Sequence, residues 1–184
     1  MADALTMLRN FDNHQPIDDK EKYDLAAMIA FLKSGADCFQ RTHLPGHFTG
    51  SALLTTRAGD KVLLNHHKSL NFWMQFGGHA DGNPDLLDVA SRELEEESGF
   101  TAFEPALSHI LDVDIHPIPY YAGKGEPAHL HYDVRYLFRL TGDDEIFTVS
   151  DESLDMRWCG YEEALTLTGA GSVARMLKKW WDLR

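Results

Sequence analysis

Acidic side chains are concentrated in one short stretch of the chain, and their number and spacing suggest that they could bind a cation. Residues 81–97 contain seven acids and a single base, Arg92, so this stretch has a local charge of −6. That is half of the net charge of −12 of all 184 residues. A run of acids is usually a solvated helix face, so the direction of each carboxylate decides between the two interpretations. The acids are Asp81, Asp85, Asp88, Glu93, Glu95, Glu96 and Glu97.

A helix predicted over residues 84–98 fixes the direction of these acids. At about 100° per residue, Glu93 and Glu97 fall on the side of the apolar residues, whereas Glu95 falls on the opposite side. Glu96 lies beside the apolar sector. That sector consists of Leu86, Val89, Ala90 and Leu94. The spacing therefore predicts that Glu93 and Glu97 point toward the interior.

Carboxylates that converge toward the interior are costly unless something neutralises them. Protonating three neighbouring acids is unfavourable, and Arg92 reaches only one of them well, for instance Glu96 at i+4. A divalent cation satisfies all of them, and hard oxygen ligands favour Mg²⁺, Mn²⁺ or Ca²⁺. Because Mg²⁺ is often shared between a few carboxylates and a substrate phosphate, the site predicts an acidic substrate.

Residues 92–100, RELEEESGF, together with Gly78, resemble the Nudix box, in which one Arg, the glutamates and two glycines fall at fixed spacing. The resemblance implies an α/β fold, an α/β/α sandwich with a mixed β-sheet, over residues 41–184, preceded by an N-terminal helical extension over residues 1–40. It also implies an enzyme that hydrolyses a diphosphate linking a nucleoside to another group X, with Mg²⁺ or Mn²⁺ as cofactor. The resemblance further suggests a homodimer.

The resemblance assigns roles to individual residues. Glu93, Glu96 and Glu97 would bind the metal, with the carbonyl of Gly78 as a backbone ligand and Arg92 in the catalytic group. Glu152, six residues before Trp158, would be a further metal ligand or the general base, although an ordinary loop acid is an equal alternative. One position departs from the pattern, because Pro84 stands where the box has an earlier Glu.

Several basic or polar residues are candidates for contact with substrate phosphates. His67 and Lys68 precede the box at the end of an apolar run, and His79 follows the two glycines. Four further candidates alternate along a predicted strand and so share one of its faces. They are His129, His131, Asp133 and Arg135. This face predicts either substrate contact or a hydrogen-bonded structural row, and His-x-His without a third ligand is a weak metal signal. The preceding loop, residues 120–127, is predicted to be a mobile lid.

The composition narrows the class of protein. A charge of −12 and a pI near 5.1 argue against general nucleic-acid binding, which needs a surplus of Lys and Arg. No apolar run is long enough for a membrane span, and two distant cysteines suggest neither a zinc knuckle nor a disulfide framework. We therefore expect a cytoplasmic enzyme with a small-molecule substrate and no membrane partner.

The remaining elements follow from periodicity and turn residues. Helices are predicted over residues 18–34, 161–167 and 173–181, and strands over 48–56, 62–65, 109–115, 130–140 and 156–158. Two other functions stay open. One is a non-catalytic nucleotide-binding module, which Pro84 favours. The other is an isopentenyl diphosphate isomerase, which would need a suitably placed Cys38 or Cys159.

Overall fold

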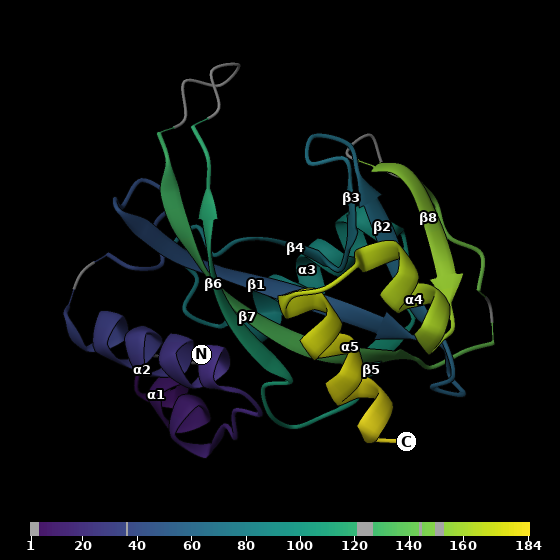
Figure 1. Ribbon diagram of the computed structural model, residues 1–184, viewed down its shortest axis with the longest axis horizontal. Coiled ribbons are helices and arrows are strands. Elements are labelled where there is room, and N and C mark those ends of the chain that lie inside the picture. The colour runs from purple at the N-terminus through teal and green to yellow at the C-terminus, as the bar shows by residue number, and fades with distance from the viewer. Residues whose placement is uncertain (1–3, 36, 121–126, 144, 150–152) are drawn as a thin grey trace.

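A central mixed β-sheet organises the computed structural model, which describes residues 4–35, 37–120, 127–143, 145–149 and 153–184 (Figure 1). Within them the sheet has eight strands. They are β1 (Gly46–Thr55), β2 (Val62–His67), β3 (Phe72–Met74), β4 (Phe76–His79), β5 (Phe103–Pro105), β6 (Asp112–Ile118), β7 (His129–Leu140) and β8 (Ser153–Cys159). β1 lies parallel to β7 along its whole length and antiparallel to β4 and β2, so both its edges are paired. The mixed sheet predicted from the resemblance is confirmed.

Helices cover both faces of this sheet and complete an α/β/α sandwich (Figure 1). α3 packs on one face against β1 and β4, and α4 and α5 lie on the other. The helices are α1 (Ala4–Asn13), α2 (Asp19–Lys33), α3 (Leu86–Ser98), α4 (Tyr161–Thr168) and α5 (Ser172–Asp182). Among the described residues, none of the helices combines the length and hydrophobicity needed to cross a bilayer.

The alternation of side chains along β1 gives the sandwich its two apolar cores. Phe48 and Ala52 point into the core beneath α3, whereas Leu53 points into the core beneath α5. Gly50 permits the close approach of α3, because a Cβ at this position would lie 2.6 Å from the Leu86 carbonyl oxygen. A larger residue would push the helix away from the strand that positions it.

The two N-terminal helices share the core of the sheet. Met7 and Phe11 of α1 and Met28 of α2 are buried in the same cluster as Phe48 of β1. Asp18 caps α2, since its side chain accepts a hydrogen bond from the Glu21 amide. Residues 4–33 therefore pack on the rest of the chain, and the boundary at residue 40 between an extension and a domain stays a prediction.

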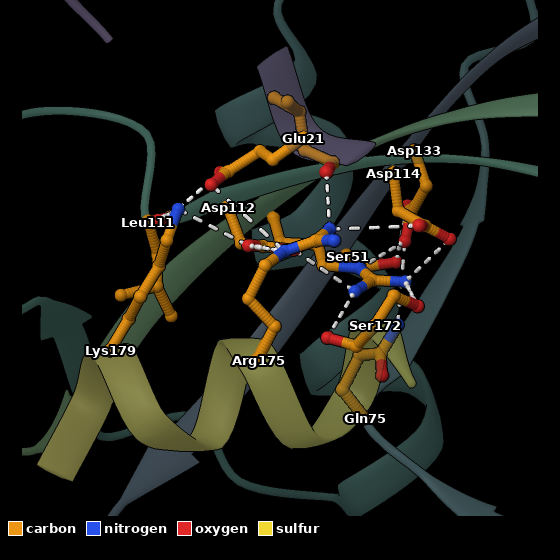
Figure 2. A network of polar contacts seen from close by, with 12 residues as sticks. Glu21, Ser51, Gln75, Leu111, Asp112, Asp114, Asp133, Ser172, Arg175 and Lys179 are labelled. Atoms are coloured by element: carbon orange, nitrogen blue, oxygen red, sulfur yellow. Dashed lines mark hydrogen bonds and ion pairs between the residues drawn. The ribbon is translucent and has the colours of Figure 1, made fainter. Parts of the chain in front are cut away.

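A buried network of charged side chains fastens α2 and α5 to the sheet (Figure 2). Asp112 of β6 accepts hydrogen bonds from Arg175 of α5 at 2.8 and 3.1 Å and from Arg135 of β7 at 3.1 Å. Lys179 of α5 lies 3.2 Å from Asp112 and also pairs with Glu21 of α2. All five side chains are less than 10% exposed. The network thus joins four elements, α2, β6, β7 and α5, through buried ionic contacts.

The Glu21 carboxylate shows how hydrogen bonds within this network offset the cost of burying a charged group. Burial alone would raise the pKa of Glu21, but hydrogen bonds from His14, Lys179 and the Ile17 amide outweigh it and lower the pKa to about 2. The carboxylate is therefore charged at neutral pH, and its cationic partner Lys179 is held beside it.

Candidate functional site

Helix α3 places the acids of the motif as its periodicity predicts. Leu86, Ala90 and Leu94 are fully buried, Glu97 is 8% exposed, and the Glu93 side chain is 15% exposed. The helix begins after Asp85, whose carboxylate accepts from the Asp88 amide, and ends at Gly99 with a left-handed backbone of φ 75°. Glu95 and Glu96 are exposed.

Arg92 holds the acids of α3 in place. Its Nη1 lies 2.8 Å from a Glu93 carboxylate oxygen and 3.4 Å from one of Glu96. Its other terminal nitrogen donates to the His79 carbonyl at 3.3 Å. The i,i+4 pairing of Arg92 with Glu96 is the one predicted from the sequence. Arg92 therefore links the end of β4 to the acidic side of α3.

Gly78 leaves room for the Glu93 carboxylate. A Cβ at residue 78 would lie 2.3 Å from the Glu93 carboxyl carbon and 2.4 and 2.5 Å from its oxygens. Gly77 is equally confined, because a Cβ there would lie only 2.3 Å from the Ser51 hydroxyl oxygen. Gly78 thus lets the backbone of β4 lie directly against the Glu93 carboxylate, and Gly77 lets it lie directly against β1.

A cavity of about 460 Å³ lies at this junction of β1, β4, β7 and α3. Three of the predicted metal ligands, Glu93, Glu96 and Glu97, line it together with Gly78. The predicted substrate residues that line it are His67, His79, His131 and Asp133. Arg41, Arg92 and His116 add further polar groups to its wall. One cavity therefore brings together most of the candidates that sequence reasoning drew from three separate segments.

Four histidines lie close together beside this cavity, and two of them, His79 and His131, line it. We call His47 of β1, His79 of β4, and His129 and His131 of β7 the histidine cluster; one ring nitrogen of each lies within 4.8 Å of those of the others. Sequence reasoning missed His47. The signal for it lies in strand pairing, because β1 and β7 run parallel with His47 opposite His131.

Burial and the neighbouring imidazoles keep His131 of this cluster uncharged at neutral pH. Burial lowers the pKa of His131, and the adjacent histidines lower it further, to about 2. His131 also has His116 of β6 beside it, with ring centroids 5.6 Å apart. His116 in turn interacts through Nδ1 with the Asp114 carboxylate at 3.0 Å.

Asp133 occupies the floor of the cavity as an acceptor. The hydroxyls of Thr49 and Ser51 donate to one of its oxygens at 2.9 and 2.7 Å. Arg135 Nε donates to the other at 2.7 Å, and the Gln75 amide at 3.4 Å (Figure 2). Asp133 therefore lines the cavity while its carboxylate is held by the protein.

Arg135 belongs to the buried ionic network. Its Nε is bonded to Asp133, one terminal nitrogen to Asp112 and the Ser172 carbonyl, and the other to Asp114 and the Ser172 hydroxyl. A guanidinium has five N–H donors, and all five are engaged here. Of the two interpretations of this strand face, the hydrogen-bonded structural row is the one that Arg135 follows.

The remaining predicted residues are His67 of the cavity wall, its neighbour Lys68, and residues outside the described part of the chain. His67 accepts a hydrogen bond from the Leu70 amide at 3.2 Å, and Lys68 is exposed next to it. Lys68 does not line the cavity. Glu152 and most of the predicted lid, residues 121–126, fall outside the described residues.

The donor chemistry of the cavity fits a hard divalent ion. Its wall includes the carboxylates of Glu93, Glu96 and Glu97, which Mg²⁺ and Mn²⁺ accept, and imidazole nitrogens, among them those of His79 and His131 from the histidine cluster. Mg²⁺ usually takes only one or two carboxylates and keeps several waters, so a roomy cavity suits it. Glu93, Glu96 and Glu97 could hold such an ion.

Comparisons with known proteins agree on one family. The family model described as the NUDIX domain matches residues 47–180. The asymmetrical bis(5′-nucleosyl)-tetraphosphatase of Caenorhabditis elegans is 27% identical over 119 residues, 65% of this chain and 80% of that protein. A probable DHNTP pyrophosphohydrolase of Lactococcus lactis subsp. cremoris is 35% identical over 81 residues, 44% of this chain and 48% of that protein.

Solved structures support the same fold. A C. elegans Ap4A hydrolase binary complex has a TM-score of 0.55 at 18% identity, covering 73% of this chain and 96% of that one. The E. coli dihydroneopterin triphosphate pyrophosphohydrolase has a TM-score of 0.55 at 13% identity, covering 74% and 96%. At such identities the likeness concerns the fold alone.

Proposed function

Because this chain belongs to the Nudix family of hydrolases, we propose that it is a metal-dependent pyrophosphohydrolase that cleaves a diphosphate linkage in a small nucleotide-type substrate. The observation that supports this most directly is the cavity that the α3 glutamates line together with Gly78 of β4. Relatives that act on a dinucleoside tetraphosphate and on a pterin triphosphate make such a polyphosphate chain the proposed substrate class.

In this proposal Glu93, Glu96, Glu97 and the Gly78 carbonyl hold Mg²⁺ or Mn²⁺. When bound, the ion supplies positive charge for the phosphates and lowers the pKa of a water nucleophile. Arg92 acts as a positioning residue, since it pairs with two of the glutamates and fixes them to β4. Glu152 is proposed as a further ligand or as the general base that accepts the proton of the attacking water.

Contact with the substrate is proposed for the residues around the cavity. His67, His79 and His131 line it, and Lys68, which follows His67 in the chain, is exposed, so that its flexible side chain is proposed to reach a phosphate. Asp133 is assigned a structural role, because its carboxylate accepts hydrogen bonds from the hydroxyls of Thr49 and Ser51. A cytoplasmic location and a homodimer remain predictions from the sequence.

The two alternative functions receive less support. Pro84 immediately precedes the N-cap of α3 and is not among the cavity residues, so the departure from the motif lies away from the acids. Cys38 and Cys159 are buried outside the cavity, and burial raises the pKa of the Cys159 thiol to about 11. Neither cysteine is placed for the carbon chemistry of an isomerase.

A hydrolysis screen tests the proposed function. Dinucleoside polyphosphates, pterin and nucleoside triphosphates and nucleotide sugars are incubated with the protein and Mg²⁺ or Mn²⁺, and released phosphate products are resolved by chromatography. We expect at least one polyphosphate to be cleaved only when a divalent ion is present. Folded protein that cleaves none of them with either ion would contradict the proposal.

Replacing Gly78 by alanine provides a second test. The new Cβ would overlap the Glu93 carboxylate, which is the far end of a flexible side chain and can move aside. We therefore expect little change in stability but a fall in kcat of about 10- to 100-fold, since a displacement near 1 Å is enough for a loss of this size.

Gly142→Ala is the matched control for this substitution, because a Cβ there meets nothing within 4 Å. Steady-state kinetics and thermal melting are measured on both variants. Equal kcat for the Gly78 variant and the wild-type protein would show that the position of Glu93 against β4 is unimportant.

A further inference from the structure

We propose that the histidine cluster binds one divalent first-row transition-metal ion, of which Zn²⁺ is representative, at a site distinct from the carboxylates of α3. Within the part of the chain that the structure describes, this is the one group of three or more possible ligands whose donor atoms all lie within 4.8 Å of one another. The inference goes beyond the proposed hydrolysis and does not depend on it.

The separations between the ring nitrogens suit such an ion. The Nε2 atoms of His129 and His131 lie 3.1 Å apart. Imidazole nitrogens around a tetrahedral Zn²⁺ at about 2.05 Å are about 3.3 Å from one another. The donor atoms of all four histidines lie within 4.8 Å of one another. Side-chain rotations that move these atoms by about 1 Å would therefore bring all four to one ion.

The tautomer of His129 is already the one that a metal ligand needs. Its Nδ1 lies 2.8 Å from the Pro127 carbonyl oxygen, so Nδ1–H donates and Nε2 presents its lone pair to the cluster. A backbone carbonyl that fixes the outer nitrogen is the usual support of a metal-bound histidine. Without an ion, His131 donates its Nε2–H to that lone pair. When an ion binds, His131 carries its proton on Nδ1 in place of Nε2. The Nε2 atoms of both His129 and His131 then present lone pairs to the ion.

The sheet holds the four rings together before any ion arrives. His47 and His131 are direct partners in the parallel β1–β7 pair, and His79 is the partner of Thr49 on the other side of β1. Ring centroids within the cluster are 4.9 to 5.1 Å apart. Three hydrogen-bonded strands thus supply all the ligands, so little conformational entropy is lost on binding.

The ligand type separates this site from the acidic one. Neutral imidazole prefers Zn²⁺, Fe²⁺, Co²⁺, Ni²⁺ or Cu²⁺, whereas carboxylate and carbonyl oxygens prefer Mg²⁺ and Mn²⁺. Four neutral ligands also leave the bound ion its full charge of +2. Because His79 and His131 line the cavity, that charge would be placed in its wall, where it attracts a polyphosphate.

Electrostatic binding of phosphate by charged histidines, as distinct from a hydrogen bond donated by a neutral ring, is the competing possibility. Electrostatic attraction of an anion needs imidazolium groups, whereas burial and the neighbouring imidazoles lower the pKa of His131 to about 2. At neutral pH His131 therefore offers a lone pair to a cation and no positive charge to an anion.

Cobalt binding tests the proposal. Protein without a histidine tag is treated with a chelator, dialysed, and titrated with Co²⁺ in excess Mg²⁺, which occupies oxygen sites but competes poorly for imidazole. We expect one equivalent of Co²⁺ to produce visible d–d absorption, Zn²⁺ to displace it, and Zn²⁺ to raise the Tm.

Matched variants locate the site. His129→Gln and His131→Gln should each weaken Co²⁺ binding at least tenfold, and the exposed His109→Gln should leave it unchanged. Glu97→Gln should keep the cobalt spectrum, which separates this site from the proposed hydrolytic one. Circular dichroism checks that each variant is folded. Absence of Co²⁺ binding in the wild-type protein, equal binding by the histidine variants, or binding of inorganic phosphate in place of Co²⁺ would each overturn the proposal.

Discussion

Glu97→Gln is expected to lower kcat at least about a hundredfold while the protein remains folded. Glu97 is buried on the inner face of α3 and lines the cavity, so its carboxylate faces the position proposed for the hydrolytic ion. Such an ion contributes several kcal/mol to the stabilisation of charge in phosphoryl transfer, and each 1.36 kcal/mol is a factor of ten in rate. The amide keeps the volume of the acid but is a much weaker ligand.

Stability should not fall in this variant. Glu97 lies in the last turn of α3, where the helix dipole disfavours a negative charge, so removing that charge costs the fold little. Urea denaturation measures this directly. Retained structure with lost turnover would assign the loss to chemistry.

Glu95→Gln is the matched control for Glu97→Gln, because Glu95 belongs to the same helix but is exposed. Its kcat is expected to stay within about twofold of that of the wild-type protein, since surface substitutions away from the site perturb little. If Glu97→Gln hydrolysed the substrate as fast as this control, the assignment of the α3 acids to the reaction would fail.

The sequence predicts the local part of this site well, because helix periodicity is a local property. Spacing alone distinguishes the inward Glu93 and Glu97 from the exposed Glu95, and burial in the structure follows the same division. The motif also predicts the family and the mixed sheet. Helix α3 begins within two residues of the predicted start at 84 and ends at the predicted residue 98.

The parts that could not be predicted depend on which strands pair. His47 joins the histidine cluster only because β1 and β7 run parallel in one particular register, and no spacing along the chain encodes that register. Short strands also escape prediction. β3 and β5 have three residues each, which is too few to show an alternating pattern. The strand predicted over residues 109–115 is shifted by three residues from β6, because Pro117 is typical of a strand end but still pairs with β7.

Arg135 illustrates a second limit of sequence reasoning. Its place on the same strand face as His131 is predicted by alternation, yet its partners Asp112 and Asp114 come from β6, and Ser172 comes from α5. The sequence alone does not distinguish a buried arginine, whose acidic partners come from distant segments, from an arginine that binds phosphate. Tertiary structure decides between the two roles.

Asp112→Asn is expected to destabilise the protein by about 3–5 kcal/mol, the usual result of removing one partner from a buried ionic network. Asp112 is fully buried and accepts hydrogen bonds from Arg135 and Arg175, with Lys179 3.2 Å away. The substitution leaves three cationic groups around a neutral amide whose NH₂ is itself a donor. For a chain of this length the loss corresponds to a fall in Tm of roughly 6–20 °C.

Glu104→Gln is the matched control for this prediction, because it removes a carboxylate from an ion pair on the surface. Glu104 accepts from Arg139 at 2.9 Å, and both side chains are about half exposed. Water solvates such a pair, so its loss should change the free energy of unfolding by less than about 1 kcal/mol. Urea denaturation at low and high salt compares the two variants. A cost for Asp112→Asn no larger than that of the control would show that the network does not fasten α5 to the sheet. A large cost that persists at high salt is the expected result, because buried charges are screened far less than exposed ones.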